Sequence, residues 1–364
     1  MTPLPPLVLR GRNGRRTVNF PTAALLAPMD GVTDPVFRAL VLDLGHAGGA
    51  CTEFVRLTTG PMSAPVLRRQ LGDPHPAAPV GLQLMTPGPE FVAATVRNAE
   101  RAGAPWVDLN FGCPVPRVFD RCAGSALLAH PERLGAIVRA AVEASDLPVS
   151  AKIRAGVDDD GLLEEVLHAA AEAGAAMIAL HARLRSDPYS RAARWEWIAR
   201  AAALLHSDHP GIPLVGNGGI DRAGDAHRMI RETGCDGVMV GRGALADPFL
   251  FREMAGGPPA SEGEARAFAV AYGRAVLEPG RRRGGPGKLK QLVRYYRAGG
   301  LFAGREEERG RLLRCRDAEE ILGWFTGRRE VAGAAARGRC PEIGVAGAPC
   351  YTRRFPPLDP RRIP

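Results

Sequence analysis

Lysine is nearly absent from this sequence. Of its 48 basic residues only three are lysines, Lys152, Lys288 and Lys290, and the rest are arginines. Arginine suits a solvated surface equally well, so each lysine suggests a position that needs a compact, mobile charge. The net charge is +9 at pH 7 and the pI is near 9.6. This charge favours an anionic partner, nucleic acid first, over a basic surface without a polyanion partner.

Other absences narrow the class of protein. No stretch approaches about 18 uncharged apolar residues, so we expect no membrane span. Residues 1–20 are rich in proline and arginine and lack the apolar core of a secretory signal, so we expect a cytoplasmic protein. The seven cysteines form an odd set without Cys-x-x-Cys spacing, which disfavours a disulfide framework or a zinc site. Cys51 and Cys235 lie in apolar runs and are expected to be small core residues.

Short apolar segments alternate with amphipathic helical segments over roughly 230 residues, a size typical of one α/β barrel. The predicted strands are 23–27, 49–55, 80–84, 104–109, 148–153, 175–180, 212–215 and 235–240. Such alternation predicts a parallel sheet, and eight repeats favour a (β/α)8 TIM barrel over a doubly wound sheet. No Gly-x-Gly-x-x-Gly follows the first strand, which argues against a dinucleotide fold.

The composition of the chain changes after Glu253. A Gly- and Pro-rich linker is followed by helical segments at 265–277, 288–298 and 305–325, which predict a smaller helical domain. The expected organisation is a loose basic arm (1–20), a barrel (21–254), a helical domain (265–326) and a poorly ordered tail (327–364).

The fourth predicted strand ends in Asp108–Pro114, which carries a cysteine in a Gly-Cys-Pro turn. The carboxyl ends of strands are where α/β folds place their chemistry. Near neutral pH a free thiol is mostly protonated, so Cys113 is a candidate general acid, with a nucleophile or a small buried residue as alternatives. Cys122 is a competing candidate, but it lies further into the loop, and Cys113 is favoured.

Two glycine-rich turns, Gly216–Gly219 and Gly241–Gly243, follow the last two predicted strands and precede helices. Glycines let backbone amides approach a phosphate, and a helix N-terminus favours negative charge. Arg242 can pair with the same group. A single turn of this kind is more often structural, but the pair on neighbouring strands indicates a phosphate site.

Three polar residues stand near strand ends. Lys152 can stabilise the reduced, anionic form of a flavin ring, although it could also be a chance lysine. His181 can hydrogen-bond a cofactor ring or act as an acid or base, the alternative being a satisfied core histidine. Gln83 both donates and accepts, which matches a ring with N–H and C=O groups, although alone it is a weak signal.

The segment Lys288–Arg297 predicts a basic helix with aromatic side chains, preceded by three arginines at 281–283. Basic and aromatic residues together suit RNA, with charge for the backbone and rings for base stacking. A solvated helix whose aromatic side enters a small core fits the same pattern, and both interpretations stay open.

With these residues identified, the chain resembles the tRNA-dihydrouridine synthases over about residues 20–300. The similar motifs occur in family order: Ala27–Asp34, Asn110–Pro114, Gly124–Leu128, Val149–Gly156, His181–Arg183, Asn217–Gly219 and Gly241–Leu245. Thr52–Arg56 and the Lys288–Arg297 helix are similar to the bacterial subgroup designated C-type.

The resemblance implies a barrel that binds flavin mononucleotide (FMN), reduced by NADPH or NADH, and a helical domain that binds tRNA. Hydride would pass to carbon 6 of a uracil flipped out of its stack, and Cys113 would protonate carbon 5. The implied cofactor contacts are Pro28, Met29, Asp30, Gln83, Lys152, His181, Asn217, Gly218, Gly219, Gly241 and Arg242. The implied substrate contacts are Asn110, Arg117, Arg183, Lys288, Lys290 and Arg294. We expect a monomer.

The sequence departs from the family pattern at two places. Arg117 stands where the family often has lysine, and His181–Leu184 lacks the usual glycine and threonine. These departures bear on substrate choice more than on reaction type. The alternatives are an FMN-dependent barrel oxidoreductase acting on a small molecule, and an RNA-binding protein built on an inactive barrel.

Overall fold

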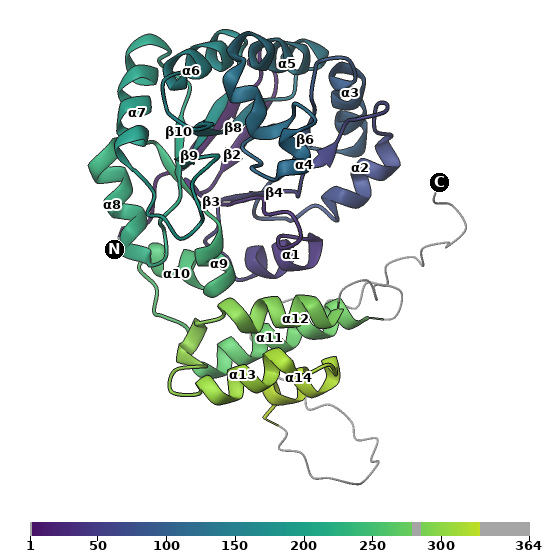
Figure 1. Ribbon diagram of the computed structural model, residues 1–364, viewed down its shortest axis with the longest axis vertical. Coiled ribbons are helices and arrows are strands. Elements are labelled where there is room, and N and C mark those ends of the chain that lie inside the picture. The colour runs from purple at the N-terminus through teal and green to yellow at the C-terminus, as the bar shows by residue number, and fades with distance from the viewer. Residues whose placement is uncertain (1, 279–284, 328–364) are drawn as a thin grey trace.

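Parallel strands close into a barrel in the computed structural model, which describes residues 2–278 and 285–327 (Figure 1). The sheet order is β4-β3-β11-β10-β9-β8-β7-β6-β5, and an additional pairing of β4 with β6 closes the ring. The strands are β3 (Ala24–Leu26), β4 (Gly49–Cys51), β5 (Val55–Arg56), β6 (Val80–Met85), β7 (Val107–Phe111), β8 (Val149–Gly156), β9 (Met177–Leu184), β10 (Leu214–Asn217) and β11 (Gly237–Val240). Because β4 and β5 pair with successive parts of β6, they share one of eight positions, and the (β/α)8 barrel is confirmed.

Helices cover the outside of the barrel because each presents an apolar stripe to the strands. They are α1 (Pro35–Asp43), α2 (Ala64–Leu71), α3 (Val92–Ala102), α5 (Pro131–Ala144), α6 (Leu163–Glu172), α7 (Glu196–Asp208), α8 (Ala223–Thr233), α9 (Arg242–Ala246) and α10 (Leu250–Met254). In α3, for example, Val92, Val96 and Ala99 are buried, and Gly103 ends the helix with φ 90°. The connection from β7 to α5 holds the short helix α4 (Pro116–Phe119) and a 3₁₀ helix, Gly124–Ala129.

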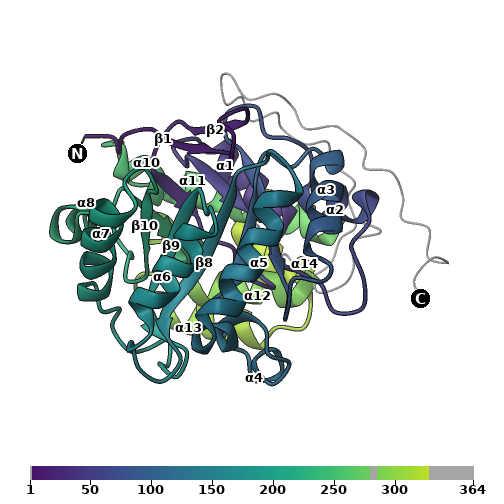
Figure 2. The ribbon, with the colours of Figure 1, turned by 90° about the horizontal axis from the view of Figure 1, so that it is seen from above.

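Residues 1–20 are not a loose arm, and that prediction is wrong. The strands β1 (Leu7–Arg10) and β2 (Thr17–Phe20) pair as an antiparallel hairpin (Figure 2). Leu9 and Phe20 are fully buried, and Phe20 packs edge-on against Trp106 with ring centroids 5.1 Å apart. Their cluster includes interior residues near the starts of β3 and β9, so the hairpin closes the N-terminal end of the barrel.

The helical domain lies below the barrel in Figure 1 and consists of α11 (Glu262–Leu277), α12 (Gly285–Tyr295), α13 (Glu306–Arg314) and α14 (Ala318–Phe325). The single helix expected over 305–325 is interrupted because Cys315 is extended, with ψ 138°, and Asp317 caps a new helix. Aromatic rings fill the interior, where Phe268 stacks on Tyr296. The Tyr296 hydroxyl donates to the Ala265 carbonyl at 2.7 Å.

Direct contacts join the helical domain to the barrel. Phe37 of α1 packs edge-on against Phe268 and Tyr272 of α11, with centroids 6.1 and 5.8 Å apart. The backbone N–H of Arg297 donates to the carbonyl of Ala246 at 2.7 Å, which ties the end of α12 to α9. Residues 328–364 of the predicted tail (327–364) and the arginines at 281–283 lie outside the described residues.

Candidate active site

Polar side chains converge at the carboxyl ends of the strands because parallel register sets them side by side. Asn110 of β7 pairs with Lys152 of β8, and Arg154 two residues later pairs with His181 of β9. His181 in turn pairs with Asn217 of β10. Strands β8 and β9 continue further than the sequence suggested, so Lys152 and His181 lie within strands rather than at their ends. Four neighbouring strands thus supply one cluster.

Lys152 is a buried ammonium whose hydrogen-bond partner is neutral. Its side chain is 9% exposed, and Nζ donates to Oδ1 of Asn217 at 3.0 Å. Asn217 is held in turn because its Nδ2 donates to the carbonyl of Met239 at 2.7 Å. Burial first, and then the charge of Arg154, lower the pKa of Lys152 to about 8. At neutral pH the lysine is charged and poorly solvated, so an anionic ring edge beside it would be stabilised.

His181 is held in its neutral form. Burial lowers its pKa well below the ordinary value of 6.5, and the positive charges of Lys152 and Arg154 lower it further. A neutral imidazole donates through one nitrogen and accepts through the other, so His181 can orient a ring by hydrogen bonding.

Cys113 lies in the turn after β7 and is 8% exposed. Its N–H donates to Oδ1 of Asn110 at 3.0 Å, and its carbonyl accepts from Oγ of Ser125 at 2.8 Å. Burial, the largest cause, and the negative charge of Asp30 both raise the pKa of the thiol. The thiol is therefore protonated at neutral pH, as a proton donor must be. Cys122, the competing candidate, is exposed in the following loop.

Arg154 belongs to the cluster, although sequence reasoning assigned it no role. Its guanidinium donates from Nε to the carbonyl of Gly112 at 2.7 Å and from Nη1 to that of Leu184 at 2.9 Å. It also lies over the ring of Tyr189, 5.6 Å from the centroid. Arg154 therefore links the cysteine turn to the loop after β9. Alternation along β8 puts Arg154 on the same face as Lys152, and this was the signal available in the sequence.

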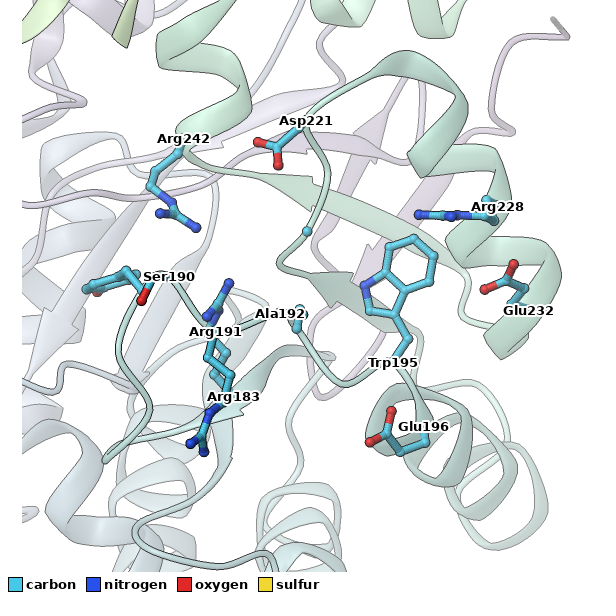
Figure 3. A pocket seen from close by; sticks show the side chains of 13 residues that line it. Arg183, Ser190, Arg191, Ala192, Trp195, Glu196, Asp221, Arg228, Glu232 and Arg242 are labelled. Atoms are coloured by element: carbon cyan, nitrogen blue, oxygen red, sulfur yellow. The ribbon is translucent and has the colours of Figure 1, made fainter. Parts of the chain in front are cut away.

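An arginine-rich cavity of about 650 Å³ lies beside this cluster (Figure 3). Its lining includes Gly219 and the side chains of Arg183, Tyr189, Arg191, Trp195, Asp221, Arg228 and Arg242. Arg183 is 3% exposed, and its Nε has no hydrogen-bond partner among the described residues. Burial and the nearby charge of Arg242 lower the pKa of Arg183. Crowded, partly unsatisfied guanidinium groups fit a phosphate.

The glycines beside this cavity leave room for a ligand's approach. Gly218 and Gly219 have φ of 107° and 74°, which side chains rarely adopt. A Cβ at Gly218 would lie 2.9 Å from Cδ2 of His181, so only glycine fits there. Gly241 precedes α9 and lies close to Met29, which follows β3. The chain's cavity, glycines and lysine together fit a phosphorylated flavin such as FMN.

Gln83 is fully buried in the middle of β6, and its amide bonds both Asp108 and Asn110. Asp108 received no role from the sequence. The predicted ring contacts Pro28, Met29 and Asp30 form the loop after β3, where Met29 N–H donates to Oγ1 of Thr33 at 2.8 Å.

The predicted substrate contacts are dispersed. Arg117 is exposed on α4, and Arg294 is exposed on α12 with Lys290 partly exposed on the same helix. Lys288 instead contacts the chain itself, because its Nζ lies 2.9 Å from both the Gly31 carbonyl and the Asp34 carboxylate. Of the predicted substrate contacts, Asn110 lies beside the cysteine turn, and Arg183 lines the arginine-rich cavity.

None of the helices in the part of the chain that the structure describes is long and apolar enough to cross a membrane.

Comparison with known proteins gives consistent matches. The family described as Dihydrouridine synthase (Dus) matches residues 25–272. The chain is 39% identical over 240 residues to a tRNA-dihydrouridine(16) synthase from Cupriavidus necator, covering 64% of this chain and 73% of that protein. A tRNA-dihydrouridine(16) synthase from Shewanella oneidensis is 34% identical over 280 residues, covering 74% and 87%.

A solved complex of 2-naphthoyl-CoA reductase with 2-naphthoyl-CoA has a TM-score of 0.51 at 12% identity, covering 68% of this chain and 51% of that one. This likeness concerns the fold alone. The family match spans more than half of the sequence, and the relatives exceed 30% identity across most of their length. The chain belongs to the dihydrouridine synthase family.

Proposed function

We propose that the protein reduces a uridine of tRNA to 5,6-dihydrouridine with FMN as its cofactor. The observation that carries this proposal is the buried, charged Lys152 with a neutral partner, at the same barrel end as the protonated Cys113 and the arginine-rich cavity. One small region thus offers a cation for a reduced ring, a proton donor and a phosphate site.

When bound, FMN would supply the hydride for carbon 6 of the uracil, with NADPH or NADH as the reductant of the flavin. Lys152 and His181 would orient the flavin ring, and the phosphate would be held by Gly218, Gly219 and Arg242. Cys113 holds the proton on Sγ and transfers it to carbon 5, and solvent returns a proton to the thiolate. The raised pKa of Cys113 supports this role because the thiol stays protonated until the base arrives.

The helical domain supports a tRNA substrate. Its exposed arginines, including Arg294 on α12, offer charge for phosphates, and Tyr295 is 40% exposed beside them. Tyr296, by contrast, belongs to the domain's own core. Because similar proteins are named tRNA-dihydrouridine(16) synthase, we infer that uridine 16 is the target. A loop uridine is more easily unstacked than a paired one.

The first test is an absorbance spectrum of the purified protein and identification of any released ligand. The proposal expects oxidised flavin bands and FMN. The protein is then incubated with NADPH and tRNA that lacks dihydrouridine, and the modified position is mapped. Wild-type protein should modify position 16, and Cys113→Ser should abolish modification while retaining FMN.

Each other outcome has a distinct meaning. Protein that stays colourless after incubation with FMN would refute the enzymatic proposal and favour an RNA-binding protein on an inactive barrel. Protein that holds FMN and oxidises NADPH but leaves tRNA unchanged would favour the small-molecule oxidoreductase. Dihydrouridine at another position would contradict the position alone.

A further inference from the structure

We propose that Asp108 is a positioning residue, which fixes the amide orientation of Gln83 and, through Asn110, the backbone turn that presents Cys113. This inference rests on the proposed function, since it concerns the proton donor and ring contact of that reaction. Asp108 lies inside the barrel on β7, one layer below the site.

A continuous series of hydrogen bonds supports this role. The register places Gln83, Asp108 and Ser150 side by side on three neighbouring strands. Ser150 Oγ donates to Oδ1 of Asp108 at 2.6 Å, and Nε2 of Gln83 donates to Oδ2 at 2.7 Å. Oε1 of Gln83 accepts from Nδ2 of Asn110 at 2.9 Å. Oδ1 of Asn110 then accepts the N–H groups of Gly112 and Cys113 at 3.1 and 3.0 Å.

The carboxylate gives this series a single direction. An ionised carboxylate only accepts, so the amide of Gln83 must turn its NH₂ group toward Asp108. Its oxygen must then face Asn110, which in turn must aim its own oxygen at the Cys113 turn. At the other end of the series, the N–H groups of Gly112 and Cys113 can only donate, so they require the same orientation of Asn110. Asp108 and these N–H groups thus fix one of the two arrangements of the amides from opposite ends.

The burial of Asp108 argues that this selection has a use. Asp108 is 2% exposed, and Gln83 and Ser150 are fully buried. Burial, the largest cause, raises the pKa of Asp108 to about 6, so its ionised form is destabilised yet prevails at neutral pH. An apolar residue would fill the core without that penalty. The fixed arrangement leaves one N–H and one oxygen lone pair of Gln83 for a ligand.

The test uses substitutions that reverse the donor-to-acceptor direction of these hydrogen bonds. In Asn110→Asp, a carboxylate faces Oε1 of Gln83, and flipping Gln83 would bring that oxygen against Asp108. The double variant Asp108→Asn with Asn110→Asp removes this conflict. Ser150 donates to the new amide oxygen, the new NH₂ donates to the flipped Gln83, and Gln83 donates to the new carboxylate at position 110. In every variant, the side chain at this position keeps an oxygen to accept from Gly112 and Cys113.

The primary readout is alkylation of Cys113 by iodoacetamide, which needs neither cofactor nor tRNA. Arg117 and Arg121 separate Cys113 from Cys122, so tryptic peptides report the two thiols independently. The exposed Cys122 is the internal control. Both variants carry a carboxylate at position 110, so its charge acts on Cys113 equally in each and the two are compared with each other. With the series broken, Cys113 should react about tenfold faster in Asn110→Asp than in the double variant.

Two single variants complete the design. Asp108→Leu removes the acceptor and should speed alkylation and lower dihydrouridine formation, each about tenfold. Asp108→Asn should retain most of both properties, because Ser150 can accept as well as donate and lets the new amide turn its oxygen to Gln83. Circular dichroism of each variant checks that the fold is intact.

Three results would overturn the inference: a double variant as reactive as Asn110→Asp, an Asp108→Leu protein identical to wild type, or an Asp108→Asn protein as impaired as Asp108→Leu. Wild-type protein that forms no dihydrouridine would refute the proposed function instead, and the alkylation rates would still decide the geometry.

Discussion

Replacing Lys152 with methionine should remove a specific pH dependence of stability. The pKa of Lys152 falls from 10.5 to about 8 on folding, chiefly because of burial. Between these values the unfolded chain binds the proton more tightly than the folded protein does. The free energy of unfolding therefore rises as pH increases through this window, and the full penalty is present below it.

The size of the effect follows from the two pKa values. A difference of about 2.5 pH units corresponds to about 3 kcal/mol in total, of which about 2 kcal/mol falls between pH 7.5 and 9.5. Methionine leaves Oδ1 of Asn217 without its donor, which costs about 1–3 kcal/mol. That loss is independent of pH, so it shifts the variant's curve without changing its slope.

The measurement is urea unfolding of both flavin-free proteins at several pH values. Burial raises the pKa of Cys51, Cys113 and Cys235. Ionisation of these thiols at alkaline pH therefore destabilises both proteins equally, and this contribution cancels when one curve is subtracted from the other. The wild-type curve minus the Lys152→Met curve should rise by about 2 kcal/mol from pH 7.5 to 9.5. Parallel curves would refute the claim that Lys152 is a poorly solvated cation in the folded protein.

Three further changes test other parts of the structure. Gly218→Ala should weaken FMN binding at least about tenfold in a fluorescence titration, because its Cβ would meet His181 at a φ of 107°. Lys288→Met should lower the free energy of unfolding by about 1 kcal/mol, because α12 loses its bonds to Gly31 and Asp34. It should also speed proteolysis of the linker between α10 and α11. Phe20→Ala should lower the free energy of unfolding by about 3–5 kcal/mol in urea titrations, because it empties the closed end of the barrel.

Matched controls separate these effects from general damage. Gly224→Ala meets no atoms within 4 Å and should retain FMN affinity. Lys290→Met alters the same helix as Lys288 and should leave the linker equally resistant to protease. Val8→Ala changes a 37% exposed residue of the same hairpin and should cost well under about 1 kcal/mol. Equal behaviour of any variant and its control would contradict the corresponding prediction.

The barrel was predictable because its strands are enclosed on both faces and therefore appear as continuous apolar runs. All eight residues of β8 are buried, for example. The N-terminal hairpin was not predictable in this way. Its strands have four residues each, so the alternation supplied by Leu7, Leu9, Val18 and Phe20 is too short to stand out among prolines and arginines.

Residues of the candidate site were predictable where they belong to a sequence motif. They were less predictable where their contacts depend on the register between strands. Cys113 and Lys152 stood out in the sequence. Asp108 and Gln83 are 25 positions apart and meet only because β6 and β7 pair in one register. The basic helix was ambiguous for another reason. Its pattern does not say which side chains face solvent and which contact the chain itself, and Lys288 contacts the chain's own barrel.

The hairpin that closes the N-terminal end of the barrel also has a kinetic consequence. Within the described part of the chain, Leu9 and Phe20 close one end of the barrel, which leaves the end that carries Cys113 for the entry of ligands. Under the proposed function, the nicotinamide and the uridine approach the same flavin through that entrance, and each must leave before the other enters. The two partners would then bind in alternation. Double-reciprocal plots of rate against NADPH concentration, measured at several tRNA concentrations, should be parallel.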